Sequence, residues 1–256
     1  LAGWGHLAGW SEFSTRVLGL FIGLLSVSTI YRLGVTLFDK HTGIISALLL
    51  GSSVYVVFYA HELRGYILYI FLTIACIYLY WKLAHQTTFS RQTALYFIIA
   101  SAILMYTHYL AIFVVIAIGL YHVLFARQLN HWKNIFFSFI LIGVSYLPWL
   151  FIGILSAYSV SKWQEGLLPQ VIITTLLSSY NNSLWFIAIP LLISSLIFYR
   201  NRATTMLWFI GVIFIALCLT VHIISPFIFN VRHVIGVLPI MTVLIAVGLA
   251  YLPYHN

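Results

Sequence analysis

The sequence predicts an all-α protein, a multi-pass transmembrane helical bundle. The chain is 63% hydrophobic and only 6% charged, whereas an ordinary soluble domain is about 25% charged. Apolar runs of roughly 17 to 25 residues recur along the chain, which is the length needed to cross about 30 Å of hydrocarbon. These runs do not alternate polar and apolar residues, as the strands of a membrane barrel would.

The length rule predicts about nine spans with short links between them. In chain order they cover 16–37, 42–60, 65–83, 93–107, 109–127, 134–157, 183–199, 204–224 and 233–252. No internal repeat or soluble insertion separates them. We therefore expect residues 1–256 to form a single transmembrane domain. We expect it to be incomplete at the N-terminus, because the chain opens at Leu1 inside a loop, and a missing part at the C-terminus is left open.

Two segments need a further argument. Residues 93–127 contain no Gly or Pro before Gly119, yet one helix of that length would be about 52 Å long, too long for a simple span. A break at 106–109 is therefore expected. Residues 169–180 begin with Pro at a favourable first-turn position but are short for a span. They are expected to form an interfacial helix on one membrane face.

Loop charges predict the orientation. One face receives Lys40, Lys82, Arg91, Arg127, Lys133, Arg200 and Arg202, and the other receives Arg16, Arg64, Lys162 and Arg232. Cytoplasmic loops carry an excess of Lys and Arg, so the first face is expected to be cytoplasmic. The net charge of +8 then reflects membrane topology, and no nucleic-acid partner is implied. The membrane bilayer is the expected partner.

Other common site types are missing from the sequence. There is no phosphate-cradling Gly-rich loop, zinc-ligand spacing, haem-attachment motif or nucleophile elbow. Cys76 and Cys218 fall inside apolar runs and are expected to be packing residues. No cofactor and no metal are implied.

Rare polar residues gather at span ends on the non-cytoplasmic face. The stretch HELRGY holds Glu62, Arg64 and Tyr66, THY holds His108, and NVRH holds Arg232 and His233. Charged groups at membrane depth usually face a cavity or one another, and the Arg fork suits phosphate. We expect an anionic-substrate site in which His108 donates a hydrogen bond or moves a proton, and Glu62 orients Arg64 or accepts from a sugar hydroxyl. Simple anchoring at the bilayer interface is the alternative for each single residue.

The order of motifs resembles a known family. SEFSTR is followed by a span, then by FDKHTGIISALLLGSSVYVVFYAHELRGY, YTHYLAIF and finally FNVRHVIGVLPIM. This is similar to the bacterial dolichyl-phosphate-mannose protein mannosyltransferase-like family. Its members are membrane glycosyltransferases of the GT-C class, related to lipid A aminoarabinose transferases.

The resemblance implies transfer of a sugar from a polyprenyl-phosphate carrier to a glycan, lipid or protein acceptor at the non-cytoplasmic face of the inner (plasma) membrane. It also implies a catalytic Asp, acting as general base, on a first external loop expected upstream of Leu1. Glu12 is then the start of a span. The chain alone would lack its base and be inactive. Glu62, Arg64, Tyr66, His108 and Arg232 match family positions, while His233 stands where a Tyr is usual.

Two other function classes fit parts of the same pattern. A flippase or exporter of lipid-linked sugars would use the same cationic cavity, but it needs access from both faces. A non-catalytic assembly subunit would need no coherent polar face. The sugar, the acceptor and the oligomeric state are not specified by the sequence.

Overall fold

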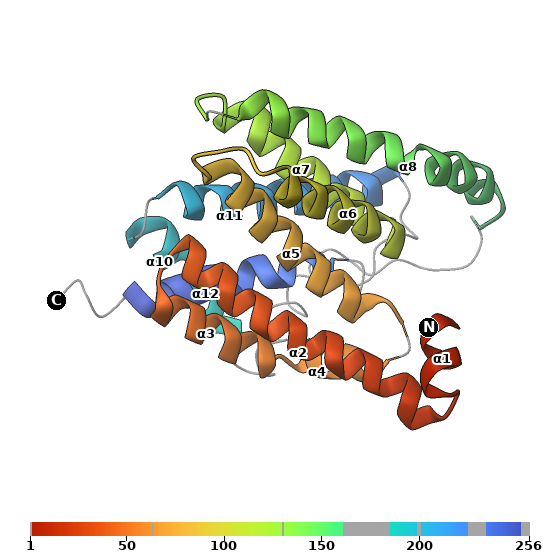
Figure 1. The fold of residues 1–256 in the computed structure, drawn as a ribbon. Coiled ribbons are helices and arrows are strands. Elements are labelled where there is room, and N and C mark those ends of the chain that lie inside the picture. The colour runs from red at the N-terminus through yellow and green to blue at the C-terminus, as the bar shows by residue number, and fades with distance from the viewer. Residues whose placement is uncertain are drawn as a thin grey trace.

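A computed structural model of the chain describes residues 2–62, 64–129, 131–160, 185–198, 201–224 and 234–251. Within these ranges the secondary structure is helical throughout, and the helices are joined by short turns (Figure 1). In order they are α1 (Ala2–Ala8), α2 (Glu12–Leu37), α3 (Lys40–Gly51), α4 (Val54–His61), α5 (Tyr66–His85), α6 (Arg91–Thr107), α7 (Ala111–Phe125), α8 (Trp132–Val160), α10 (Trp185–Phe198), α11 (Arg202–Ile224), the 3-10 turn η3 (Ile235–Val237) and α12 (Leu238–Tyr251).

Each expected span overlaps one or two of the described helices, with some ends that differ by several residues. The predicted break within 106–109 is confirmed, because α6 ends at Thr107 and α7 begins at Ala111. By length and composition, four of the described helices can each cross a membrane alone, namely α2, α5, α8 and α11, and the α3–α4 pair is a fifth candidate. The expected interfacial helix at 169–180 lies outside the described residues.

The second expected span, 42–60, is not one straight helix. It is split into α3 and α4, which are bent by 54°. The Ser52 hydroxyl donates to the Leu48 carbonyl at 2.8 Å, and Ser53 then takes an extended conformation with φ −65° and ψ 124°. Serine hydroxyls that bond back to the preceding turn bend helices. The Ser52-Ser53 pair is therefore the physical reason for the bend.

The opening residues were expected to be a loop, and this expectation is wrong for residues 2–8. They form α1, which ends before Gly9, a residue with φ 81°. The Trp4 indole nitrogen donates to the Ser14 carbonyl at 2.7 Å, which ties α1 to the first turn of α2. The expected start of a helix at Glu12 is confirmed, with Ser11 as its N-cap.

Helix α5 is the central helix of the bundle. In its most apolar window 61% of residues are buried, compared with 33% in α2 and 22% in α8. Its side chains Tyr69 and Tyr80 are fully buried. The outer helices instead expose apolar side chains, as shown by Leu24 on α2 at 67% exposure. Such a surface is expensive in water and is normal against lipid tails.

The helices bring the turns together at two opposite ends (Figure 1). One end carries α1, the α4–α5 turn and the α6–α7 turn. The other carries the turns after α2, α5 and α7, the start of α11 and the end of α12. At this second end the Tyr251 hydroxyl donates a short hydrogen bond to the Asp39 carboxylate, joining the α2–α3 turn to α12.

Candidate functional site

The polar stretch HELRGY forms the corner between α4 and α5. Helix α4 ends at His61, and Glu62 leaves it in an extended conformation with φ −80° and ψ 141°. Helix α5 begins after Gly65, whose carbonyl accepts from the Tyr69 N–H at 2.9 Å. The extended Glu62 turns its side chain out of the helical repeat. The corner therefore carries an exposed Arg64 beside a partly buried Glu62.

Helix α2 packs against this corner at very close range. A Cβ added to Gly19 would lie 2.3 Å from the Ala60 carbonyl oxygen. No real side chain fits there, so only glycine lets the two backbones approach so closely. The corner is thereby held against the part of α2 that carries Thr15 and Arg16.

The end of α6 reaches the same corner. A Cβ added to Gly65 would lie 3.1 Å from the Thr107 methyl group. The absence of a side chain at Gly65 thus lets Thr107 and the following His108 approach the start of α5. Residues 64–66 and 107–108 are distant in sequence and meet here.

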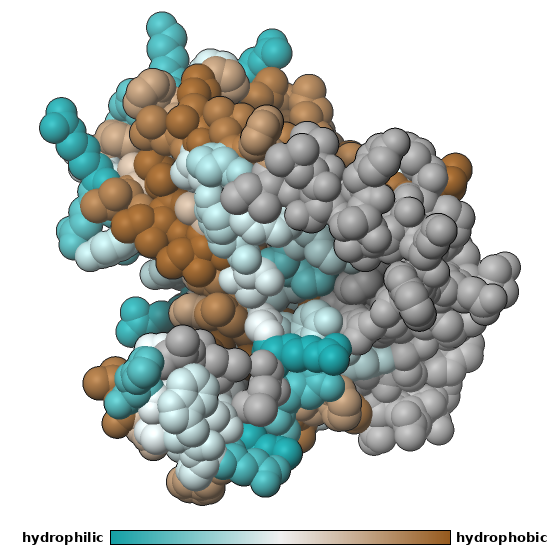
Figure 2. All heavy atoms as spheres, turned by 90° about the vertical axis from the view of Figure 1, so that its right-hand side faces the viewer, coloured by the Kyte–Doolittle hydropathy of each residue, from teal (hydrophilic) through white to brown (hydrophobic). Residues whose placement is uncertain are grey.

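Two cavities open at the corner, and Glu62 and Arg64 line both of them. The first has a volume of about 250 Å³ and lies between α2 and α5. Its other lining residues are Thr15, Leu18, Gly19, Ile22, Gly65, Ile67 and Leu68. The second has a volume of about 550 Å³, and its other lining residues are Arg16, Val57, Phe58 and His61. Figure 2 looks at this end of the molecule and shows hydrophilic surface below a more hydrophobic region.

Glu62 has an unusual environment. Its Oε2 is buried and has no hydrogen-bond partner among the described residues, and its carboxylate makes no ion pair with the exposed Arg64. The expected direct contact, in which Glu62 holds Arg64, is therefore not present in this structure. Both side chains instead face the same cavities. A buried acceptor without a donor costs roughly 1 to 3 kcal/mol, so Glu62 is poised to accept a hydrogen bond from a bound molecule.

Arg16 is a second arginine at this site. It projects from the first turns of α2 into the larger cavity and pairs with Glu12 at 2.6 Å. Both side chains of that pair are well exposed, at 46% and 76%, so the pair is weak and readily rearranged. Arg16 and Arg64 together give the cavity a positive character.

His108 is held in place by the aromatic rings of α5. Its ring stacks on Tyr69, with centroids 5.1 Å apart and planes 9° from parallel, and the Tyr66 ring lies 6.0 Å away. The Leu110 N–H donates to Nδ1 at 3.3 Å. A neutral ring therefore carries its proton on Nε2, the tautomer that donates from that side.

An aromatic wall continues from His108 to α4. The ring centroids of Tyr66 and Tyr59 are 4.8 Å apart, and those of Tyr59 and Tyr55 are 6.0 Å apart. The wall fixes the position of Tyr66 through packing. Tyr66 is only partly buried, so it can also contact a molecule bound at the corner.

Four of the six residues expected from sequence therefore lie at one end of the bundle: Glu62, Arg64, Tyr66 and His108. The remaining two, Arg232 and His233, lie outside the described residues. The chain is described again from Val234, and Gly236 packs against the hydroxyl of Tyr69.

Sequence reasoning missed Arg16 and Tyr69 as parts of the site. The loop charges placed Arg16 on the same membrane face as the corner, and this placement could have identified it as a site residue. Tyr69 is one helical turn from Tyr66 and so shares its face, but only the structure shows that it stacks on His108. Among the described residues no three His, Cys, Asp or Glu side chains converge as metal ligands would.

Comparisons with known proteins were made on sequence and on structure. The family model for dolichyl-phosphate-mannose-protein mannosyltransferases matches residues 1–152, which include the corner and His108. No curated protein matches the sequence. Two solved structures of ArnT from Cupriavidus metallidurans are similar in fold. The apo form has a TM-score of 0.70, and the form bound to undecaprenyl phosphate has a TM-score of 0.72.

Both ArnT structures are 15% identical to this chain and cover 97% of it. The chain in turn covers 47% and 48% of those structures, so it spans about half of their length. The fold is thus the GT-C-like membrane bundle that the motif order implied.

Proposed function

The chain belongs to the dolichyl-phosphate-mannose-protein mannosyltransferase family, and from this premise we propose that it takes part in transferring a sugar from a polyprenyl-phosphate donor to an acceptor at the non-cytoplasmic face. The single observation that carries the proposal is the corner itself. Arg16 and Arg64 line one cavity at the end of an apolar bundle, beside a carboxylate whose buried oxygen has no partner.

The two cavities suit the two parts of such a donor. The larger one offers Arg16, His61 and Arg64 to an anionic phosphate, and Arg binds phosphate through its planar fork. The smaller one is lined on one side by apolar residues of α2 and α5. The isoprenoid chain would leave the phosphate along these residues toward the lipid.

The proposed reaction is a displacement at the anomeric carbon. The acceptor hydroxyl oxygen forms a bond to that carbon, and the bond between the carbon and the phosphate oxygen breaks. The bonding electrons leave with the phosphate, and the hydroxyl proton passes to a general base. The family resemblance assigns that base to an Asp on a first external loop upstream of Leu1.

The described residues contribute electrostatics and positioning. Negative charge grows on the phosphate as it leaves, and Arg64 stabilises this charge more strongly in the transition state than in the bound donor. Glu62 accepts a hydrogen bond from a sugar hydroxyl through its buried oxygen. His108 is stacked on Tyr69 at the same end of the bundle, and it is a further candidate for contact with the donor.

Transfer assays on the natural full-length protein in membranes test this proposal. The donor is a radiolabelled polyprenyl-phosphate sugar, and lipid, polysaccharide and protein acceptors are offered separately. Arg64→Ala is expected to lower the transfer rate by about a hundredfold to a thousandfold, which is the range for removing one charge-stabilising donor. Arg91→Ala, at the opposite end, is the matched control and should leave the rate unchanged. Equal rates for wild type and Arg64→Ala would exclude Arg64 from the reaction.

We also propose that no divalent metal takes part, because Glu62 is the one carboxylate among the described residues that line these cavities and hard cations need several oxygen ligands. A chelator should leave transfer intact. Loss of activity in a chelator, restored by Mg²⁺ or Mn²⁺, would contradict this part of the proposal.

A further inference from the structure

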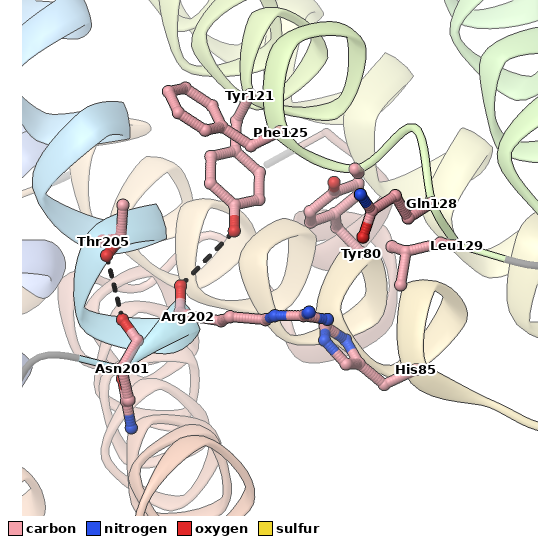
Figure 3. A pocket seen from close by; sticks show the side chains of 10 residues that line it. Tyr80, His85, Tyr121, Phe125, Gln128, Leu129, Asn201, Arg202 and Thr205 are labelled. Atoms are coloured by element: carbon pink, nitrogen blue, oxygen red, sulfur yellow. Dashed lines mark hydrogen bonds between the residues drawn. The ribbon is translucent and has the colours of Figure 1, made fainter.

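A larger cavity lies at the opposite end of the bundle, far from the corner. Its volume is about 600 Å³, and it lies between the end of α5, the α7–α8 turn and the start of α11 (Figure 3). The residues lining it are Tyr80, His85, Tyr121, Phe125, Ala126, Gln128, Leu129, Asn201, Arg202 and Thr205. Nothing in the proposed reaction uses this cavity.

Its polar groups are cationic or hydrogen-bonding. The Arg202 side chain extends across the cavity toward the His85 ring (Figure 3) and lies close enough for its charge to act on that ring. A neighbouring cavity of about 370 Å³ shares Leu129 and is lined by Arg127, His131 and Lys133. None of the described residues lining either cavity is an Asp or Glu.

These cations have no counter-ion within the described chain. The ion pair that the described residues contain, Glu12 with Arg16, lies at the corner end. Asp39 is the acidic residue at this end among the described residues, and its carboxylate already accepts hydrogen bonds. It caps α3 by accepting from the Thr42 N–H at 2.8 Å, and it accepts from the Tyr251 hydroxyl. The charge of Arg202 is thus available to an external anion.

The backbone around Arg202 is fixed before any ligand arrives. The Tyr121 hydroxyl donates to the Arg202 carbonyl at 3.4 Å, and Asn201 caps α11 by accepting from the Thr204 N–H at 2.7 Å. The first turn of α11 therefore begins at this cavity. The positive end of the helix dipole adds to the charge of the guanidinium.

The surface beside the cavity indicates that the anion belongs to a lipid. Leu124 and Phe125 on α7 are 57% and 55% exposed, and Phe125 also lines the cavity. A cavity for a water-borne phosphate has no need of such a border. A membrane phospholipid would place its phosphate near Arg202 and its first acyl carbons over these side chains.

We propose that this cavity binds the phosphate headgroup of an anionic membrane lipid at the face opposite the sugar-transfer site. General attraction of basic loops to a negative leaflet acts on every Lys or Arg near the surface, whether or not the residue lines a cavity. At a specific lipid-binding site, the effect of a charge on lipid binding depends on where the residue lies. Residues lining the cavity contribute, and equally charged neighbours outside it do not.

Native mass spectrometry of the purified chain in detergent tests this proposal. Phosphatidylglycerol is titrated against phosphatidylcholine with the same acyl chains. Wild type is expected to bind phosphatidylglycerol more tightly, and Arg202→Gln to weaken that binding by about fivefold or more. Lys82→Gln is the matched control, because Lys82 carries the same charge at the same end but does not line the cavity. It should bind phosphatidylglycerol as tightly as wild type does.

Further arms separate the alternatives. Arg202→Lys retains the charge and loses the fork, so it should fall between wild type and Arg202→Gln, and this milder variant protects against a folding artefact. Arg64→Ala should bind as wild type does, which separates this site from the sugar-transfer site. Equal weakening by Lys82→Gln would mean diffuse charge attraction, and full displacement of the lipid by an excess of inorganic phosphate would mean a free-anion site. Either result would overturn the proposal.

Discussion

Glu62 combines a cost to stability with a proposed role in binding. Its Oε2 is buried and lacks a donor among the described residues, so the folded chain bears part of the desolvation cost of a carboxylate. Such an arrangement is expected of a group whose hydrogen-bond donor is supplied by a bound ligand.

Replacing Glu62 by Gln should therefore raise stability and lower function together. The amide keeps the shape and removes the charge, so we expect the free energy of unfolding to rise by roughly 1 kcal/mol while sugar transfer falls. Thermal unfolding in detergent and the transfer assay measure the two effects. Glu12→Gln is the control, since its exposed pair with Arg16 contributes little. Lower stability with unchanged transfer would show that Glu62 is structural.

Asp39 gives a test based on pH. Burial raises the pKa of its carboxyl, but hydrogen bonds from Tyr251 and Thr42 outweigh burial and leave the pKa below its ordinary value. A group with a lowered pKa stabilises the fold above its unfolded pKa of about 3.9, and this contribution is lost as the pH falls through the folded value.

Asp39→Asn keeps a side chain that can cap α3 and removes the charge. We expect the variant to unfold at a lower temperature than wild type at pH 7, and the gap to close as the pH falls below about 4. Unfolding curves across this range provide the measurement. A gap that is the same at both ends of the range would mean that ionisation of Asp39 does not matter.

The site shows what the sequence could and could not predict about single residues. Span ends and loop charges placed Glu62, Arg64, Tyr66 and His108 at one end, and the structure brings them there. Sequence patterns could not predict that Glu62 and Arg64 make no ion pair. The directions of their side chains depend on the extended backbone at Glu62, which is seen only in the structure. Nor could the patterns reveal the stacking of Tyr69 on His108, which depends on how α5 and α6 pack.

The helices were more predictable than the site. A run of apolar residues long enough to span a bilayer needs its backbone hydrogen bonds satisfied internally, which leaves helix as the outcome. The break after Thr107 followed from length alone. The bend at Ser52-Ser53 did not, because it depends on a hydroxyl bonding back to Leu48. Helix α1 was missed because it is short and lies outside any span.

The contact between α2 and α4 can be tested with one methyl group. Gly19→Ala would place a Cβ 2.3 Å from the Ala60 carbonyl oxygen, so the helices must separate at a cost of about 1 to 3 kcal/mol. Gly143→Ala is the control, since nothing lies within 4 Å of the added atom and alanine favours helix. We expect lower thermal stability and lower transfer for Gly19→Ala alone. Unchanged behaviour would show that α2 does not hold the corner.

The whole molecule has two polar ends, and the proposed function requires that they face opposite sides of the membrane. The native cysteines Cys76 and Cys218 are both buried, so an added surface cysteine can be labelled selectively. Leu7 on α1 is 87% exposed and marks the corner end, while the exposed Thr88 marks the opposite end.

Leu7→Cys should react with a membrane-impermeant maleimide applied from outside the inner membrane. Thr88→Cys should react only after that membrane is permeabilised. Labelling of intact and permeabilised cells, read by gel shift, provides the measurement. Reaction of both variants from one side would contradict the orientation derived from the loop charges.

The central claim is that the α4–α5 corner binds the phosphate of a polyprenyl-phosphate donor. The most direct test is photocrosslinking with a polyprenyl phosphate that carries a diazirine next to the phosphate, followed by peptide mapping. The account predicts crosslinks within 57–68 on α4 and α5 and within 15–22 on α2, reduced in Arg64→Ala and unchanged in Arg91→Ala. Crosslinks concentrated around Arg202 at the opposite end, or insensitive to Arg64, would contradict it.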